Sequence, residues 1–378
     1  MTEKTTASTT YIQVRSFRTE TGTEEAFAVI GATDRRMPFS QQLDAIWRRC
    51  QEYRQSVPSL HPVFERWFLS DSSQQQSAVE ELRKGAENAV SIIEQPPLDG
   101  TKAALLVYLQ SDTTTSVLKE GLFSASHGSY RHIWACSRKA DGKSSREQAK
   151  ELLISYGEQI SEHGNTLSDN CIRTWFFVND IDNNYHGVVT ARNDVFSTQG
   201  LTRDTHFIAS TGIGGRCAER GCSVMFDAYA VNGIVPEQIQ YLQAPDYLNP
   251  TYEYGVSFER GTAVTYGDRK HVFISGTASI DNCGNIVHTG DVIGQTERML
   301  QNVQALLRTA KAQMKDIMHA IVYLRDIADY QVVSELLENR LQGIPYVITY
   351  APVCRPGWLI EMECMAITAS GDSRFPAL

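Results

Sequence analysis

One order of predicted elements occurs three times along the chain at similar spacing, and this repeat limits the fold more than any single motif does. Each unit has a helix, then an apolar strand closed by an aspartate (Asp71, Asp180 or Asp326), and later a further apolar strand. The helix begins 30, 35 and 35 residues before the aspartate, and the last strand lies 34, 44 and 34 residues after it. Three units of about 120 residues therefore account for the chain, and three unrelated α+β segments are the alternative.

The last third shows the element order most clearly. Apolar residues between Ile293 and Leu307 recur at helical spacing, and unbroken apolar runs predict strands. This order predicts an α+β fold. The strands expected in this third are His271–Ile280, Ile317–Leu324, Pro345–Pro352 and Trp358–Ile367, and its helices are Asp291–Lys311 and Tyr330–Leu341. The helices expected earlier are Phe39–Gln55 and Ser145–His163, and the earlier strands are Val63–Leu69, Val90–Glu94, Lys102–Leu109, Ile172–Val178, Thr205–Thr211 and Cys222–Val231.

Two stretches of turn-forming residues divide the chain. Ser111–Thr115 (SDTTT) lies at the first junction, and the polar, proline-bearing Tyr241–Tyr254 is expected to be a linker at the second. The predicted units are therefore residues 1–112, 113–245 and 246–378.

Charge and cysteine usage exclude several classes of protein. The formal net charge is −9 and no run of Lys or Arg occurs, so we expect no nucleic-acid partner. No stretch reaches about 18 apolar residues, so no membrane span is expected, and the polar segment Met1–Thr10 is not expected to be a secretory signal. The eight cysteines are scattered without a CxxC pair, which predicts a reducing cytoplasm, no disulfides and no metal site.

Several stretches of the last third resemble the Rid family, also called the YjgF family. They are FISGTASI (Phe273–Ile280), GDVIGQTERMLQNVQALL (Gly290–Leu307), IVYLRDIADY (Ile321–Tyr330) and LIEMECMAI (Leu359–Ile367). The likeness is weaker in the middle unit (Thr174–Val189) and weakest in the first (Val63–Leu82). The resemblance implies a mixed sheet backed by two helices in each unit, and active sites in clefts between neighbouring units. Three units in one chain would form a pseudo-trimer, present as a monomer or as a higher homo-oligomer.

A narrower resemblance is to the chorismatases, a branch with Rid-like domains. The similar stretches are YRHIW (Tyr130–Trp134), STGIGGR (Ser210–Arg216), YGVSFERGTAV (Tyr254–Val264), Ser275–Thr296 and VCRPGWLIEMEC (Val353–Cys364), whereas Ala135–Lys143 departs from the branch pattern. The resemblance implies an enzyme that removes pyruvate from chorismate or a related enolpyruvyl compound. It implies a small carboxylate substrate and no cofactor.

Glu361 is the candidate catalytic residue. Side chains alternate along a strand, so Glu361 and Glu363 are expected on one face of WLIEMECMAI, among apolar neighbours. A desolvated carboxyl has a raised pKa and can act as a general acid near neutral pH. The chorismatase resemblance assigns that role to Glu361. The alternative is an exposed pair of acids on the solvated face of the strand.

The candidate substrate-binding residues could hold carboxylates or line the pocket. Arginine binds a carboxylate through two parallel hydrogen bonds, and glycines let backbone amides approach an anion. The resemblance places a pocket cysteine at Cys354 and a pocket serine–glycine pair at Ser275 and Gly276. The candidates are Arg216, Arg260, Arg355, Cys354, Tyr254, Ser275, Gly276, Thr277, Gly212 and Gly214.

Two other functions remain open. Rid deaminases hydrolyse enamines and imines, and they bind the substrate carboxylate through an arginine about fifteen residues before the strand glutamate. The corresponding stretch, Tyr346–Tyr350, has no arginine, so this activity is disfavoured unless an arginine of the middle unit, such as Arg216, binds the carboxylate. The third possibility is a small-molecule binding protein without catalytic activity, whose clefts are filled by the chain's own side chains.

Overall fold

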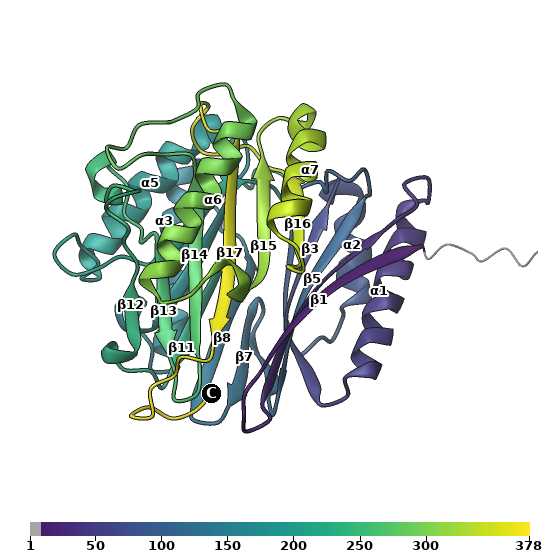
Figure 1. The fold of residues 1–378 in the computed structure, drawn as a ribbon, viewed down its shortest axis with the longest axis horizontal. Helices are drawn as coiled ribbons and strands as arrows, with labels where there is room; N and C mark the ends of the chain where they lie inside the picture. Colours follow the sequence, from purple (N-terminus) through teal and green to yellow (C-terminus); the bar gives the residue numbers. More distant parts are fainter. Residues whose placement is uncertain (1–8) are drawn as a thin grey trace, which may run out of the picture.

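The computed structural model describes residues 9–378, which form three mixed β-sheets with helices packed on them (Figure 1). Most of the segment Met1–Thr10, in which no secretory signal was expected, lies outside the described residues. Within residues 9–378, no helix is both long and apolar enough to cross a membrane.

The third sheet has the strand order β12-β13-β14-β17-β15-β16, in which β15 and β16 are parallel and the other neighbours are antiparallel. Helix α6 packs on this sheet through a face that includes Met299, Val303 and Leu306, and Asp291 caps its first turn. The elements are β12 (Ile239–Tyr241), β13 (Gly261–Thr265), β14 (Lys270–Ala278), α6 (Val292–Thr309), β15 (Ile317–Leu324), α7 (Tyr330–Arg340), β16 (Tyr346–Tyr350) and β17 (Ile360–Thr368).

The middle sheet has the same arrangement, β6-β7-β8-β11-β9-β10, with its one parallel pair between β9 and β10. Its elements are β6 (Thr114–Lys119), β7 (Leu122–His127), β8 (Tyr130–Arg138), α3 (Ser145–Ser161), α4 (Leu167–Asn170), β9 (Cys171–Val178), α5 (Ile181–Thr198), β10 (Ala209–Gly214) and β11 (Val224–Asn232).

The first sheet repeats this order with one strand fewer, β1-β2-β5-β3-β4, and β3 and β4 form its parallel pair. Its elements are β1 (Thr10–Arg18), β2 (Glu24–Ala32), α1 (Phe39–Ser56), β3 (Leu60–Leu69), α2 (Ser72–Leu82), β4 (Ala89–Glu94) and β5 (Ala103–Ser111). Three units of one topology confirm the predicted fold class.

The three repeated aspartates lie at the starts of helices, and two of them accept a hydrogen bond from the first turn. Each follows a buried strand and stands at the start of the next helix. The side chain of Asp71 accepts a hydrogen bond from Gln74 N in the first turn of α2, and that of Asp326 accepts one from Ala328 N. Asp180 precedes α5 with a left-handed backbone and makes no such bond.

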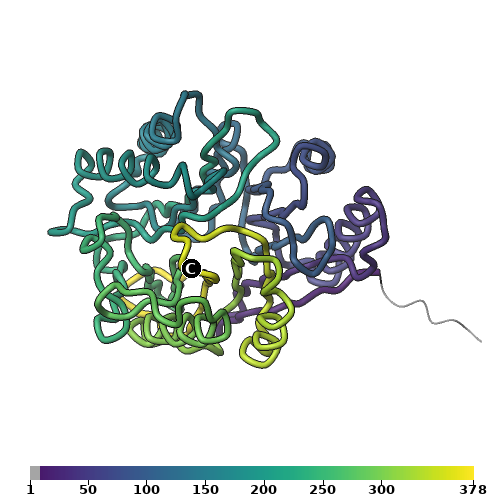
Figure 2. Tube along the Cα trace, turned by 90° about the horizontal axis from the view of Figure 1, so that it is seen from above, coloured from purple at the N-terminus to yellow at the C-terminus, as the bar shows by residue number. Residues whose placement is uncertain are grey.

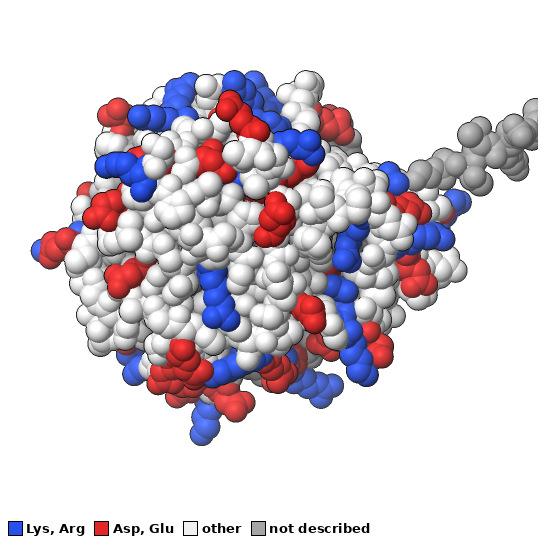
Figure 3. Space-filling model, turned by 90° about the horizontal axis from the view of Figure 1, so that it is seen from below, with Lys and Arg blue, Asp and Glu red and all other residues white. Residues whose placement is uncertain are grey.

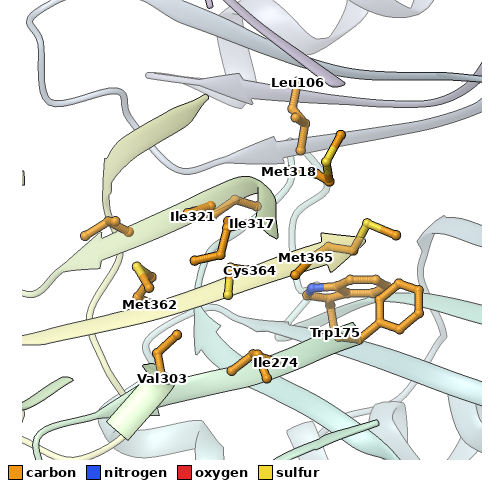
Figure 4. Close-up of a cluster of buried hydrophobic side chains, with 14 of the residues drawn as sticks. Leu106, Trp175, Ile274, Val303, Ile317, Met318, Ile321, Met362, Cys364 and Met365 are labelled. Carbon is orange, nitrogen blue, oxygen red and sulfur yellow. The ribbon is translucent and has the colours of Figure 1, made fainter. Parts of the chain in front are cut away.

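The units close into a ring around a common centre. Short backbone bridges join each pair of units: Glu94 with Arg216, Ala209 with Glu259, and Pro97 with Thr349. Seen from above, the helices lie at the periphery and the sheets face inward (Figure 2). Side chains of all three units meet in the buried core, among them Leu106, Trp175 and Ile274 (Figure 4). On the outer face shown in Figure 3, acidic and basic side chains are interspersed.

Candidate active site

The candidate site is a cleft between the middle and third units. The middle unit contributes α5 and β10, and the third unit contributes β14, β17 and the loops before β13 and β17. The cleft and the solvent-filled space at its mouth together span about 510 Å³. Its lining includes Tyr185, Arg192, Ser210, Gly212, Tyr254, Phe258, Arg260, Gly276, Cys354, Arg355, Trp358 and Glu361.

Glu361 lies at the base of this cleft, on β17, opposite Tyr323 of β15 and Ala278 of β14. The residue is 4% exposed, and within residues 9–378 its carboxyl group accepts no hydrogen bond. Burial, together with the negative charge of Glu363, raises the pKa of Glu361 from 4.5 to about 8. The carboxyl is therefore mostly protonated at neutral pH and can donate a proton.

Gly276 leaves the space that the Glu361 carboxyl occupies. A Cβ atom at this position would overlap Glu361 Oε1 and would lie 3.1 Å from Thr211 Cγ2. The amide of Gly276 donates a 2.9 Å hydrogen bond to Thr211 Oγ1 of the middle unit. This hydrogen bond between the two units therefore fixes the backbone of Gly276, against which the Glu361 carboxyl group packs.

Glu363 is also buried, and it is fully engaged by its neighbours. Its carboxylate accepts hydrogen bonds from Arg173 Nη2 (2.8 Å), Thr211 Oγ1 (2.5 Å) and Trp175 Nε1 (2.8 Å). Neither glutamate is exposed, so the alternative of an exposed acid pair does not hold. The two glutamates therefore have different roles. Glu363 links the third unit to the middle unit, whereas the carboxyl group of Glu361 makes no hydrogen bond and faces the cleft.

Three arginines surround the cleft. Arg192 of α5 is 1% exposed, and within the described chain its Nε and Nη2 atoms have no hydrogen-bond partner. Its guanidinium lies 5.6 Å from the ring of Phe258, and Arg260 lies at the same distance from that ring. Arg355 lies 4.6 Å from the ring of Tyr254. With Glu361 neutral, these three cations favour an anionic ligand.

Comparisons with known proteins match this architecture. The family model described as Endoribonuclease L-PSP matches residues 261–368. A 3-aminoacrylate deaminase, RutC, from Acinetobacter baylyi is 32% identical over 65 residues, covering 17% of this chain and 52% of that protein. A RutC family protein from Pyrococcus abyssi is 32% identical over 101 residues, covering 25% of this chain and 76% of that protein. The chain belongs to the Rid family.

A crystal structure of a chorismatase shares the fold of this Rid protein over nearly its whole length. The match covers 96% of this chain and 100% of that one, with a TM-score of 0.65 and 19% identity. The resemblance to the Rid family is thus confirmed, and the arrangement of three units in one chain is shared with a solved structure.

The cleft of this Rid protein contains most of the residues singled out in the sequence. Glu361, Arg260, Arg355, Cys354, Tyr254, Gly276 and Gly212 all line it. Ser275 and Thr277 lie behind its wall: Ser275 Oγ donates to Glu259 O, and Thr277 Oγ1 donates to Ser275 O.

Two of the candidates lie at a different place in the Rid protein. Arg216 forms an ion pair with Glu94 of the first unit. The amide of Gly214 donates to Pro352 O. Strand β10 places Gly212 in the cleft, whereas Gly214 at its end lies between Pro352 of the third unit and Gln95 of the first, and Arg216 pairs with Glu94 of the first unit.

The thiol of Cys354 is not poised as a nucleophile. Burial raises its pKa to about 12, and the neighbouring Glu361 adds to the effect. Tyr185 packs beside Gly212, where a Cβ would lie 2.5 Å from its ring, and burial raises the pKa of its hydroxyl as well. Both groups therefore line the cleft as neutral donors or acceptors.

Sequence reasoning missed Arg192, Tyr185 and Trp358. The sequence does contain a sign of Arg192, because it lies on the same buried face of α5 as Val188 and Val195. A charged residue at such a position needs a partner or a ligand.

The other two sheets of the Rid protein have no acid at the position of Glu361. Glu361 lies opposite the penultimate residue of β15, and the residues opposite the penultimate residues of β9 and β3 are Met225 and Ala104. Within residues 9–378, no group of His, Cys, Asp or Glu side chains is placed to hold a metal ion.

Proposed function

We propose that this protein releases pyruvate from chorismate or a related enolpyruvyl compound, with Glu361 as the general acid. One observation carries the proposal: a buried carboxyl group, whose pKa is raised by burial, faces a cleft that three arginines surround. The chorismatase fold supports it, because that structure spans both units that form the cleft.

The chemistry needs a proton donor and a water molecule. Glu361 transfers its proton to the methylene carbon of the enol ether, which leaves an oxocarbenium ion and a Glu361 carboxylate. Water adds to the cationic carbon and returns a proton to Glu361. The resulting hemiketal breaks its bond to the ring oxygen, and pyruvate and the ring alcohol leave. A new carboxylate in a buried site is electrostatically matched to the cation that forms beside it.

The arginines would hold the two carboxylates of chorismate. Arg192 is the strongest candidate, because its Nε and Nη2 hydrogen atoms have no acceptor within the described chain. A buried guanidinium without an acceptor is costly, and a substrate carboxylate would supply two acceptors at once. Arg260 and Arg355 already contact Asn249 and Tyr254, so their orientation is fixed before the substrate enters.

Replacing Arg192 with methionine is expected to raise KM by about 10–100-fold, since a hydrogen bond to a charged group contributes roughly 1.5–3 kcal/mol. Methionine keeps the packing of the side-chain stem. The matched control is Arg216→Met, at an arginine outside the cleft, which should leave KM within about twofold. Equal effects of the two substitutions on KM would remove Arg192 from the substrate site.

Replacing Gly276 with alanine is expected to lower kcat by about 100-fold, because the new methyl group displaces the Glu361 carboxyl from its position. The control is Gly157→Ala, on helix α3, where a Cβ makes only an ordinary 3.4 Å contact. Initial rates of pyruvate release measure both. A Gly276→Ala protein with the wild-type kcat would show that the position of the carboxyl is not important.

The pH dependence of kcat follows from the protonated form of Glu361. The rate is expected to be constant below about pH 8, the pKa of Glu361, and to fall tenfold per pH unit above it. Rates measured between pH 6 and pH 10 at saturating substrate test this. A rate that increases with pH through 8 would mean that Glu361 acts as a base.

The function itself is tested by mixing the protein with chorismate and following the products by proton NMR. Pyruvate and one ring product in equal amounts are expected, and the ring signals identify that product. If no pyruvate forms and chorismate does not raise the melting temperature, chorismate is not the substrate.

A second candidate is an enamine or imine hydrolase. Arg192 favours it, because a Rid deaminase needs a carboxylate clamp and this arginine comes from the middle unit. The relative named 3-aminoacrylate deaminase supports the same candidate. Ammonia released from 3-aminoacrylate, with chorismate left intact, would favour this activity.

A further inference from the structure

The loop between β10 and β11 brings two cysteines of the middle unit together. The end of β10 and the start of β11 flank the same residue of β9, Val178, on its two sides. The loop therefore has to turn back, and it does so at Gly221, whose φ is +82°. Cys222 N donates to Glu219 O at 3.4 Å to close this turn. Cys217 and Cys222, at the two ends of the turn, are both free thiols.

The thiols of Cys217 and Cys222 lie within hydrogen-bonding distance of each other, and Cys222 Sγ also lies 3.4 Å from Val224 O. The hydrogen bond from Cys222 lowers the pKa of the Cys217 thiol below its ordinary value of 9.0, although burial acts against it. The backbone amide of Glu219 and the Lys139 cation lower the same pKa, whereas the Glu219 carboxylate raises it. Cys217 is therefore the thiol that ionises first.

Neighbouring elements hold this loop from both sides. Ala218 N donates to Gln76 Oε1 of helix α2, in the first unit, at 3.0 Å. Gln148 of helix α3 donates to Gly221 O at 2.8 Å and accepts from Ser223 N at the same distance. These contacts keep the two sulfur atoms close in the folded chain, which raises the rate of a reaction between them.

The pair lies just below the surface of the middle unit. Cys217 is 6% exposed and Cys222 is 9% exposed, whereas Cys50 is fully buried. The residues between the two cysteines, 218–221, are all partly or fully exposed. A small oxidant therefore has a short path to the sulfur atoms. A thiol of low pKa beside a second thiol is the arrangement that peroxides oxidise reversibly.

We propose that Cys217 and Cys222 form a reversible oxidation site, separate from the cleft, whose oxidant is hydrogen peroxide. The Cys217 thiolate attacks one oxygen of the peroxide, the O–O bond breaks, and the departing hydroxide takes up the proton that Cys217 lost. The Cys222 sulfur then attacks the sulfenic acid on Cys217, its S–O bond breaks, and a second water leaves with the Cys222 proton. The two thiols lose two electrons and two protons, and one peroxide becomes two water molecules.

The test is to treat the reduced full chain with one equivalent of hydrogen peroxide at neutral pH and to map the thiols by mass spectrometry. Trypsin separates peptide 217–220 from peptide 221–260, so a disulfide links these two peptides until dithiothreitol releases them. We expect the linked peptides to form at least about tenfold faster than Cys283, an exposed cysteine, is oxidised. Oxidation of Cys283 with Cys217 and Cys222 left reduced would overturn the proposal.

Two variants separate the pair from a single reactive cysteine. In Cys222→Ser, oxidation is expected to stop at the sulfenic acid of Cys217, which dimedone traps. The control Cys283→Ser removes an exposed thiol and should leave the rate at which the linked peptides form unchanged. A Cys222→Ser protein in which dimedone labels other cysteines but not Cys217 would contradict the assigned order of attack.

The last measurement needs no substitution and covers the case in which Cys222→Ser does not fold. In urea the two sulfur atoms separate, and both thiols return to the ordinary pKa. The preference of peroxide for the pair over Cys283 is then expected to fall to about twofold, because two ordinary thiols compete with one. A tenfold preference that persists in urea would show that the folded loop does not create the site.

Discussion

Replacing Glu361 with glutamine is expected to lower kcat for pyruvate release by about 10²–10⁴-fold, the range that a positioned general acid contributes. Glutamine has nearly the same volume and fills the same space beside Gly276, but its amide cannot supply the proton. The measurement is pyruvate formation from chorismate under saturating conditions. The control is Glu297→Gln, on the outer face of α6, which should leave kcat unchanged.

The melting temperature of the Glu361→Gln variant shows whether its lower kcat comes from the missing proton donor or from unfolding. The folded-state pKa of Glu361 lies above its ordinary value of 4.5, so the folded protein binds the extra proton, and this carboxyl lowers stability as pH increases from about 4.5 to about 8. The glutamine variant has no such penalty. Its melting temperature at pH 8 is therefore expected to equal or exceed that of the wild type. A stable variant that retains activity within tenfold would exclude Glu361 as the acid.

Replacing Asp227 with alanine is expected to reduce the free energy of unfolding by about 3–5 kcal/mol, because it leaves the guanidinium of Arg66 buried without its main partner. Asp227 is buried and binds Arg66 Nη2 at 2.8 Å, Ser91 Oγ at 2.5 Å and Ser137 N at 2.7 Å. These contacts join the first and middle units. Urea unfolding, followed by circular dichroism, measures the change.

Two further variants test whether the lost stability of Asp227→Ala comes from the unpaired Arg66 or from a general loss of contacts. Asp372→Ala breaks the exposed pair with Arg374 and should leave the free energy of unfolding almost unchanged. The double variant Arg66→Met with Asp227→Leu replaces the buried pair by apolar side chains and should recover most of the lost stability. A single Asp227→Ala variant as stable as Asp372→Ala would contradict the importance of the buried pair.

The fold could be predicted largely from the repeat. The predicted strands and the amphipathic helices α1, α3 and α6 appear close to where the apolar pattern places them, but the pattern gave no strand at β1, β2, β6, β7, β8 or β13. The pattern missed α2, whose sequence SSQQQSAVEEL is mostly polar, and the 18-residue helix α5. It also missed the short edge strand β12, which ends at Tyr241, the first residue of the expected linker. Such elements depend on capping and on contacts with neighbouring strands, which a hydrophobic period does not report.

The candidate site could be predicted mainly where the third unit supplies it, and Gly212 is a predicted residue of the middle unit that also lines the cleft. Strand alternation makes Glu361 a candidate that the chorismatase resemblance then favours, and the turn beside Gly357 makes Arg355 one of three candidate arginines. Arg192 comes from another unit, and its position in the cleft depends on how the units pack. Arg216 and Gly212 are four residues apart in the sequence, yet Gly212 lines the cleft with the third unit, whereas Arg216 pairs with the first unit.

The two walls of the cleft lie on one polypeptide, with Arg192 in the middle unit and Glu361 in the third. In an assembly of separate subunits, such a site disappears on dilution, because association follows mass action. Here the middle and third units are parts of one chain, so the effective concentration of one wall near the other does not depend on the protein concentration. The specific activity per chain should therefore stay constant from micromolar to picomolar protein.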